Sequence, residues 1–294
     1  MPDFPDQPAD PRPRGPGDAL PVPGTPAGRA GLAALLADPA RALIGVDFDG
    51  TLSPIVPDPA DARALPAATA ALRRLSGLVG TLAVITGRPA PDAVRLASLA
   101  DVPGILVLGQ YGRQRWEAGT LTSPPPPEGL AGVRARLPGV LTAAGAPDGT
   151  RIEDKGDALA VHTRRTADPR AALELLEAPL RELAASGGLA VEPGRMVIEL
   201  RPPGADKGGT LRALVEERGA AATMYCGDDL GDRPAFEAVR ELRDHGIPGV
   251  VVCSGSAEVP ELAEAADLVV NGPQEVAALL AALADTIQSG IQRG

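Results

Sequence analysis

Lysine is nearly absent from this chain of 294 residues: of its 28 basic residues only Lys155 and Lys207 are lysine, and all the others are arginine. The planar arginine fork cannot replace the compact lysine ammonium in a site that needs a point charge. Positions that keep lysine against such a bias are therefore candidates for functional residues, with chance retention as the alternative.

The chain also lacks an excess of positive charge, because its net charge is −10 at pH 7. A basic surface is what binds nucleic acid or anionic membranes, so neither is expected as a partner. An anionic substrate would have to be held by a metal ion and a few local cations.

Cysteine is scarce too, and long apolar runs are missing. Cys226 and Cys253 each lie within an apolar, strand-like run, which is typical of small buried hydrophobic residues in a reducing compartment. No apolar run reaches the length that a bilayer requires, and the polar, proline-rich start is unlike a signal peptide. The expected location is the cytoplasm.

Short apolar runs alternate with helical patterns over most of the chain. Apolar runs at 42–46, 81–85 and 104–108, and again at 222–226, 249–253 and 267–270, predict strands buried on both faces. This rhythm is typical of an α/β fold with a doubly wound parallel sheet.

Two stretches depart from that rhythm. Residues 1–30 are rich in Pro, Asp and Gly and are predicted to form an unstructured tail, with a short helix at 31–38. Residues 124–204 begin with four prolines and show a helix followed by two strands, twice over. They predict a small inserted α+β cap domain, which leaves 31–123 and 205–294 as the core domain.

The apolar run at 42–46 ends abruptly in Asp-Phe-Asp-Gly-Thr. In an extended segment, residues two apart share a face, so Asp47 and Asp49 are expected to point the same way. Two carboxylates this close favour a bound cation or a shared proton. The alternative is a surface turn, since Asp and Gly are common in turns.

Further polar residues follow other predicted strands or begin a helix: Thr86, Lys207, Asp228 and Asp229. Because parallel strands end at the same edge of a sheet, these side chains are expected to gather around Asp47. Carboxylates suit Mg²⁺, and a lysine and a hydroxyl beside such a metal suit a phosphoryl group. Histidine is not needed, and His245 is expected to be idle in an exposed loop.

The motifs at 47–51, 85–87, 207–208 and 227–232, in this order, resemble those of the haloacid dehalogenase superfamily of phosphohydrolases. The resemblance implies that Asp47 is the nucleophile that forms an aspartyl-phosphate, and that Asp49 is the acid and base. It implies that Thr86 and Lys207 bind the phosphoryl group. It also implies that Mg²⁺ is held by the Asp47 side chain, the Asp49 carbonyl and Asp228.

The same resemblance implies that Asp229 and Asp232 orient bound water or the lysine. For Asp232, a stabilising charge at a helix N-terminus is an equal alternative. The last acidic motif departs from the family pattern, because Gly231 stands where threonine is usual and Arg233 where glutamate is usual. These departures bear on metal affinity rather than on the reaction.

The inserted segment resembles the cap of trehalose-6-phosphate phosphatases at 152–164 and 194–202. A site for many sugar hydroxyls needs ionised acceptors and donors together, which Glu153, Lys155 and Glu199 supply; the family uses the matching positions to hold the distal glucose. The weaker candidates are Arg195, His162 and Arg164. A solvated charged face is the alternative for such alternating residues. Residues 109–114 read Gly-Gln-Tyr-Gly-Arg-Gln, whereas many relatives have Gly-x-His-Gly-x-Glu.

The sequence therefore predicts a cytoplasmic, Mg²⁺-dependent phosphatase, a phosphoric monoester hydrolase that releases trehalose from trehalose 6-phosphate. Its expected partners are the small-molecule sugar phosphate and the synthase of the same pathway. One alternative is another sugar phosphate, such as sucrose phosphate or a glucosyl- or mannosylglycerate phosphate. The other is a catalytically silent, sugar-phosphate-binding regulatory partner.

Overall fold

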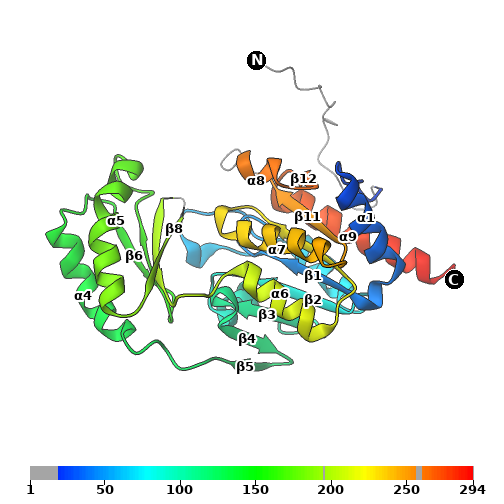
Figure 1. Cartoon of the computed structure of the whole chain (residues 1–294), viewed down its shortest axis with the longest axis horizontal. Coiled ribbons are helices and arrows are strands. Elements are labelled where there is room, and N and C mark those ends of the chain that lie inside the picture. The colour runs from blue at the N-terminus through cyan, green and yellow to red at the C-terminus, as the bar shows by residue number, and fades with distance from the viewer. Residues whose placement is uncertain (1–18, 195, 256–259, 294) are drawn as a thin grey trace, which may run out of the picture.

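The computed structural model describes residues 19–194, 196–255 and 260–293. Figure 1 shows two units side by side: a larger sheet with helices around it on the right, and a smaller sheet with α4 and α5 on the left. Both ends of the described chain lie in the larger unit.

The larger sheet has eight strands in the order β12-β11-β10-β1-β2-β3-β4-β5. The six strands from β12 to β3 are parallel, and β4 and β5 extend the sheet as an antiparallel edge. The strands are β1 (Ala42–Val46), β2 (Thr81–Ile85), β3 (Ile105–Gly109), β4 (Gln114–Glu117), β5 (Thr120–Thr122), β10 (Ala222–Gly227), β11 (Gly249–Ser254) and β12 (Leu268–Val270).

Helices cover both faces of this sheet and make two apolar cores. One core packs α1, α2, α3 and α9 on one face, and the other packs α6, α7 and α8 on the opposite face. Every residue of β1 is buried, as expected of a strand with helices above and below it. The helices are α1 (Pro26–Ala37), α2 (Pro66–Leu75), α3 (Ala90–Leu96), α6 (Lys207–Arg218), α7 (Arg233–Asp244), α8 (Pro260–Glu264) and α9 (Gly272–Ile291).

The strand order reverses at β1. The chain runs outward from β1 through β2 to β3, and it later returns to the other side of β1 with β10. Loops that leave β1 and β10 at their carboxyl ends diverge at such a switch point, and the crevice between them is where open α/β sheets bind ligands.

The smaller sheet has four antiparallel strands in the order β6-β7-β9-β8. Alternate residues of β7 and β9 pack against α4 and α5 in a third apolar core, so the opposite face is left for polar side chains. The elements of this unit are α4 (Leu130–Ala143), β6 (Arg151–Asp154), β7 (Leu159–His162), α5 (Pro169–Ser186), β8 (Ala190–Gly194) and β9 (Val197–Arg201).

The predicted fold class is confirmed, with four differences in detail. Helix α1 begins at Pro26, inside the stretch expected to be an unstructured tail, because Thr25 caps it by accepting from the Gly28 amide. The expectation for residues 1–18 lies outside the described residues. The β4–β5 edge and helices α7 and α8 were not predicted. Within the described part of the chain, no helix has the length and apolar character needed to cross a bilayer.

Candidate active site

Asp47 directly follows β1 at the switch point of the sheet and is 4% exposed. Its Oδ1 lies 2.7 Å from the ammonium nitrogen of Lys207. Lys207 is the first residue of α6, whose position is set by Asp206, because the Asp206 carboxylate caps the helix by accepting from the Gly209 amide at 2.7 Å. Burial by itself lowers the pKa of Lys207, but the charges of nearby carboxylates more than offset it and raise the pKa. The lysine is a fixed cation beside Asp47.

Asp232 holds this lysine from the other side. The Lys207 ammonium donates to Asp232 Oδ1 at 2.7 Å, and the Tyr225 hydroxyl donates to the same oxygen at 2.6 Å. Oδ2 accepts from the amides of Asp228 and Asp229 at 3.0 and 3.2 Å. The fully buried carboxylate therefore has both oxygens occupied by protein donors.

Asp228, in contrast, has an open oxygen. Its buried Oδ1 has no hydrogen-bond partner among the described residues, and carboxylate oxygens of Asp47, Asp228 and Asp232 lie within 4.8 Å of one another. Burial and the charge of Asp47 raise the pKa of Asp228 to about 10, and burial and the charge of Asp232 raise that of Asp47. Such crowding disfavours ionised carboxylates unless a cation neutralises them. An oxygen-only donor set with one open oxygen fits a hard divalent cation such as Mg²⁺.

Asp49 lies beyond the end of β1 and is bound by an arginine. Arg88 Nε and Nη2 each lie 2.7 Å from a carboxylate oxygen of Asp49, a bidentate geometry. The guanidinium also donates to the Pro59 carbonyl and lies over the Phe48 ring. Thr86 is 1% exposed at the end of β2, and its Oγ1 accepts from the Arg88 amide at 3.2 Å. Asp49 therefore faces a cation rather than sharing a proton with Asp47.

The polar face of the smaller sheet carries its own cluster of charges. Glu153, Ala160 and Glu199 are paired in register across β6, β7 and β9, so all three share one face, with the small Ala160 between the two carboxylates. Lys155 forms an ion pair with Glu199, and His162 contacts Glu153 at 2.8 Å. Burial favours the neutral form of each carboxyl, but Lys155 lowers the pKa of Glu199 and His162 lowers that of Glu153.

Two side chains of the larger unit reach this face. The Tyr111 hydroxyl donates to Glu199 Oε2 at 2.6 Å, and the side-chain amide of Gln110 donates to the backbone carbonyl of Lys155. Both residues follow β3, whose carboxyl end lies at the same edge as those of β1 and β2. The charged face of the small sheet is thus set directly against the edge that carries Asp47.

A model of the trehalose-phosphatase family matches residues 45–271. The chain belongs to this family. It is 35% identical over 258 residues to the trehalose-phosphate phosphatase of Mycobacterium avium (strain 104), an alignment of 83% of this chain and 62% of that protein. The chain thus spans about three fifths of the length of that relative.

Solved structures are similar over nearly the same range. A trehalose-6-phosphate phosphatase related protein is 25% identical with a TM-score of 0.65, covering 86% of this chain and 100% of that one. The C-terminal domain of Candida albicans trehalose-6-phosphate phosphatase has a TM-score of 0.70 at 23% identity, covering 91% and 99%. The second likeness shows a shared fold.

Within this trehalose-phosphatase fold, most of the residues singled out in the sequence come together. The larger unit gathers its set around β1, and the smaller unit gathers its set on one face of its sheet. The sets are Asp47, Asp49, Thr86, Lys207, Asp228 and Asp232 in the first, and Glu153, Lys155, His162 and Glu199 in the second.

Two of the predicted residues lie apart from these sets. Asp229 is exposed and its carboxylate accepts from the Gly231 amide, whereas Asp47 and Asp232 contact Lys207. Arg164 is exposed beyond the end of β7. Arg195 lies outside the described residues. His245 is exposed, as expected, at the end of α7, and its ring contacts the Glu241 carbonyl.

Three residues of the site were missed in the sequence: Arg88, Tyr111 and Tyr225. Arg88 follows Thr86 by two residues, so the reasoning that brings strand ends to one edge could have found it. Tyr111 lies in a motif noted only for its departure from relatives. Tyr225 is in the middle of an apolar strand, and no sequence pattern indicates that its hydroxyl donates to Asp232.

Proposed function

We propose that this protein hydrolyses trehalose 6-phosphate to trehalose and phosphate with Mg²⁺ as cofactor. One observation carries the proposal: a buried carboxylate–lysine centre at the switch point faces a set of charges on the smaller sheet, of which Glu199 is buried and Glu153 and Lys155 are partly buried. The Tyr111–Glu199 and Gln110–Lys155 contacts join the two. We further propose that residues 124–204 form a cap domain that selects the substrate, with 31–123 and 205–294 as the catalytic core.

In the proposed reaction Asp47 attacks phosphorus, and an aspartyl-phosphate forms as the bond to the sugar oxygen breaks. Asp49 must first leave Arg88, which binds its ionised form, and take up a proton from solvent. It then donates this proton to the sugar oxygen, which leaves as the sugar hydroxyl. Water then attacks the aspartyl-phosphate, Asp49 takes its proton, and Asp47 is released together with phosphate. Arg88 has to free one Asp49 oxygen for these transfers, because it now occupies both.

Thr86 and Lys207 bind the phosphoryl oxygens in this proposal, since Thr86 follows β2, the neighbour of β1, and the Lys207 ammonium lies 2.7 Å from Asp47. Asp232 keeps the ammonium in place. The carboxylates of Asp47 and Asp228 hold Mg²⁺, joined by the carbonyl of Asp49. When bound, the metal neutralises phosphoryl charge. Asp232 is a poor ligand because both its oxygens already accept hydrogen bonds.

On the cap, Glu153, Lys155 and Glu199 are proposed to bind sugar hydroxyls, with His162 supporting Glu153. Closure of the cap over the substrate would exclude water during phosphoryl transfer. We also propose a cytoplasmic location and a functional partnership with the synthase that makes the substrate. The two free, buried cysteines are compatible with a reducing compartment.

The test is phosphate release with Mg²⁺ from trehalose 6-phosphate, sucrose 6-phosphate, glucosylglycerate phosphate and an aryl phosphate. Asp47→Asn is expected to lower kcat at least ~10³-fold on every substrate, because the nucleophile is lost. Lys155→Ala is expected to lower the ratio of sugar to aryl phosphate turnover. Turnover of another sugar phosphate alone would leave the chemistry and refute the sugar assignment. No turnover of any substrate would favour the silent binding partner.

A further inference from the structure

The loop after β3 has an unusual backbone. Gln110, Tyr111 and Gly112 have φ values of 49°, 58° and 95°, so three successive residues lie in the left-handed region and two of them are not glycine. Such a conformation is disfavoured for residues with a Cβ and persists only where surrounding contacts impose it, which is common at functional sites.

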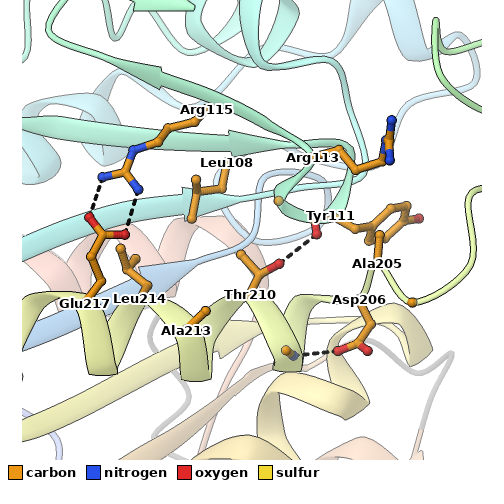
Figure 2. A pocket seen from close by; sticks show the side chains of 13 residues that line it. Leu108, Tyr111, Arg113, Arg115, Ala205, Asp206, Thr210, Ala213, Leu214 and Glu217 are labelled. Atoms are coloured by element: carbon orange, nitrogen blue, oxygen red, sulfur yellow. Dashed lines mark hydrogen bonds and ion pairs between the residues drawn. The ribbon is translucent and has the colours of Figure 1, made fainter. Parts of the chain in front are cut away.

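The contacts that impose it come from the phosphoryl site. The backbone N–H of Gln110 donates to the Arg88 carbonyl at 2.8 Å, and the backbone N–H of Tyr111 donates to the Thr86 carbonyl at 3.0 Å. Thr210, one turn after Lys207 in α6, donates its hydroxyl to the Tyr111 carbonyl at 2.7 Å (Figure 2). The loop is therefore tied to β2 and to the helix that begins with the lysine.

The Tyr111 side chain packs between Arg201 and Gly87 and extends to the cap. The Arg201 guanidinium lies 4.0 Å from the ring centroid, and a Cβ at Gly87 would lie 2.7 Å from the hydroxyl oxygen. Burial and the charge of Glu199 raise the pKa of Tyr111, so the phenol remains a hydrogen-bond donor. It donates to one oxygen of Glu199, while Lys155 pairs with the other.

We propose that Tyr111, a residue of the core, is a specificity-determining positioning residue that orients Glu199 for the sugar. The proposal rests on the function proposed above, because it takes Glu199 as a sugar ligand. Without the phenol hydroxyl, Glu199 keeps its ion pair with Lys155 but loses the contact that fixes its orientation relative to the core. The distance between the sugar site and Asp47 is then no longer fixed by this contact. The backbone of the loop that carries Tyr111 is bonded to the Thr86 carbonyl. The orientation of Glu199 therefore depends on the position of the backbone at Thr86.

Another contact between core and cap supplies a matched control. Arg165, an exposed cap residue, donates to the Pro57 carbonyl at 2.7 Å. It has no hydrogen bond or ion pair with Glu153, Lys155, His162 or Glu199, the described charged residues on the sugar-facing side of the cap. Arg165→Gln removes a hydrogen bond between the two units without touching Glu199. It therefore reports what general loosening of the cap does to the kinetics.

The experiment measures KM and kcat for trehalose 6-phosphate and for an aryl phosphate in wild type, Tyr111→Phe and Arg165→Gln. Phenylalanine keeps the ring over which Arg201 packs, and thermal melting checks the fold. Tyr111→Phe is expected to raise KM for the sugar phosphate about tenfold, the effect of losing a hydrogen bond to a charged acceptor. The kcat for that substrate is expected to change less than twofold, and Arg165→Gln to leave the ratio of the two KM values unchanged.

Three results would overturn the inference. An equal rise in KM on both substrates, or the same ratio change in Arg165→Gln, would mean that the phenol only holds the cap in place. A lower KM for the sugar phosphate would mean that Tyr111 competes with the sugar for Glu199. An unchanged KM would mean that the phenol has no part in recognition. Wild-type turnover separately decides the proposed function; if another sugar phosphate is the substrate, the same ratios are measured with that sugar.

Discussion

Replacing Asp232 by asparagine is expected to destabilise the protein, although the two side chains have the same shape. The carboxylate accepts two hydrogen bonds at each oxygen, from Lys207 and Tyr225 on one side and from two backbone amides on the other. In Asp232→Asn one of these oxygens becomes an amide NH₂ group. In either orientation that group faces two donors that can no longer bond to residue 232; of the four donors, Lys207 still has an acceptor in Asp47.

Each buried donor left without an acceptor costs about 1–3 kcal/mol. Loss of the negative charge reduces this cost, because Asp232 contributes to the repulsion that raises the pKa values of Asp47 and Asp228. The expected net decrease in the free energy of unfolding is about 2–4 kcal/mol, which lowers the urea midpoint by about 1 M or more.

The assay is urea unfolding with EDTA present, so that metal binding does not contribute. The single tryptophan, Trp116, lies in β4, and its fluorescence therefore follows the unfolding of the larger sheet. The matched control is Asp229→Asn, which affects an exposed carboxylate that accepts from backbone amides at the start of the 3-10 turn Leu230–Asp232. Asparagine caps such a turn as well as aspartate does, so the variant is expected to cost less than about 1 kcal/mol. If the two variants had the same midpoint, the reasoning about the four donors would be refuted.

Three further predictions concern the metal site and the cap. Mg²⁺ at 100 times its Kd is expected to raise the free energy of unfolding by about 2.7 kcal/mol, and Asp228→Asn to abolish this gain in thermal melts; an equal gain in the variant would exclude Asp228 as a ligand. Gly50→Ala is expected to lower both the melting temperature and Mg²⁺ binding by calorimetry, because φ is +72° and the new Cβ would lie 1.9 Å from Asp228 Oδ2; wild-type values for both would count against it. Glu199 has a lowered pKa because Lys155 outweighs the effect of burial, so its stabilising effect is complete above the unfolded pKa of about 4.3 and is lost as pH falls through the lower folded value. The stability difference between wild type and Glu199→Gln is therefore expected to be constant near neutral pH and to shrink below about pH 4.3 in urea titrations; a constant difference down to pH 3 would refute the shift.

The main strands and the position of Asp47 were predictable because both depend on local pattern. A run of apolar residues that ends in carboxylates predicts a buried strand with an acidic end. The meeting of Asp47, Thr86, Asp228 and Lys207 then follows from parallel topology alone, since all parallel strands end at one edge.

The exceptions depend on geometry that sequence patterns do not encode. Both oxygens of Asp232 are occupied, whereas one oxygen of Asp228 is open, and this difference depends on side-chain rotamers and on a tyrosine from the middle of β10. The left-handed turn at Gln110 and Tyr111 is imposed by distant contacts, against the preferences of these two residues. Helix α1 extends further than expected because Gly28 allows close packing on Asp267.

The scarcity of lysine makes the two halves of the site separately observable. Lys207 contacts Asp47 and Asp232 in the larger unit, and Lys155 contacts Glu199 in the smaller one. Incorporation of isotopically labelled lysine would give two side-chain ammonium signals in a magnetic resonance spectrum, one from each unit, with no exposed lysines to obscure them. Addition of inorganic phosphate is expected to shift the Lys207 signal and addition of trehalose the Lys155 signal, so each binding event could be followed in the unmodified sequence.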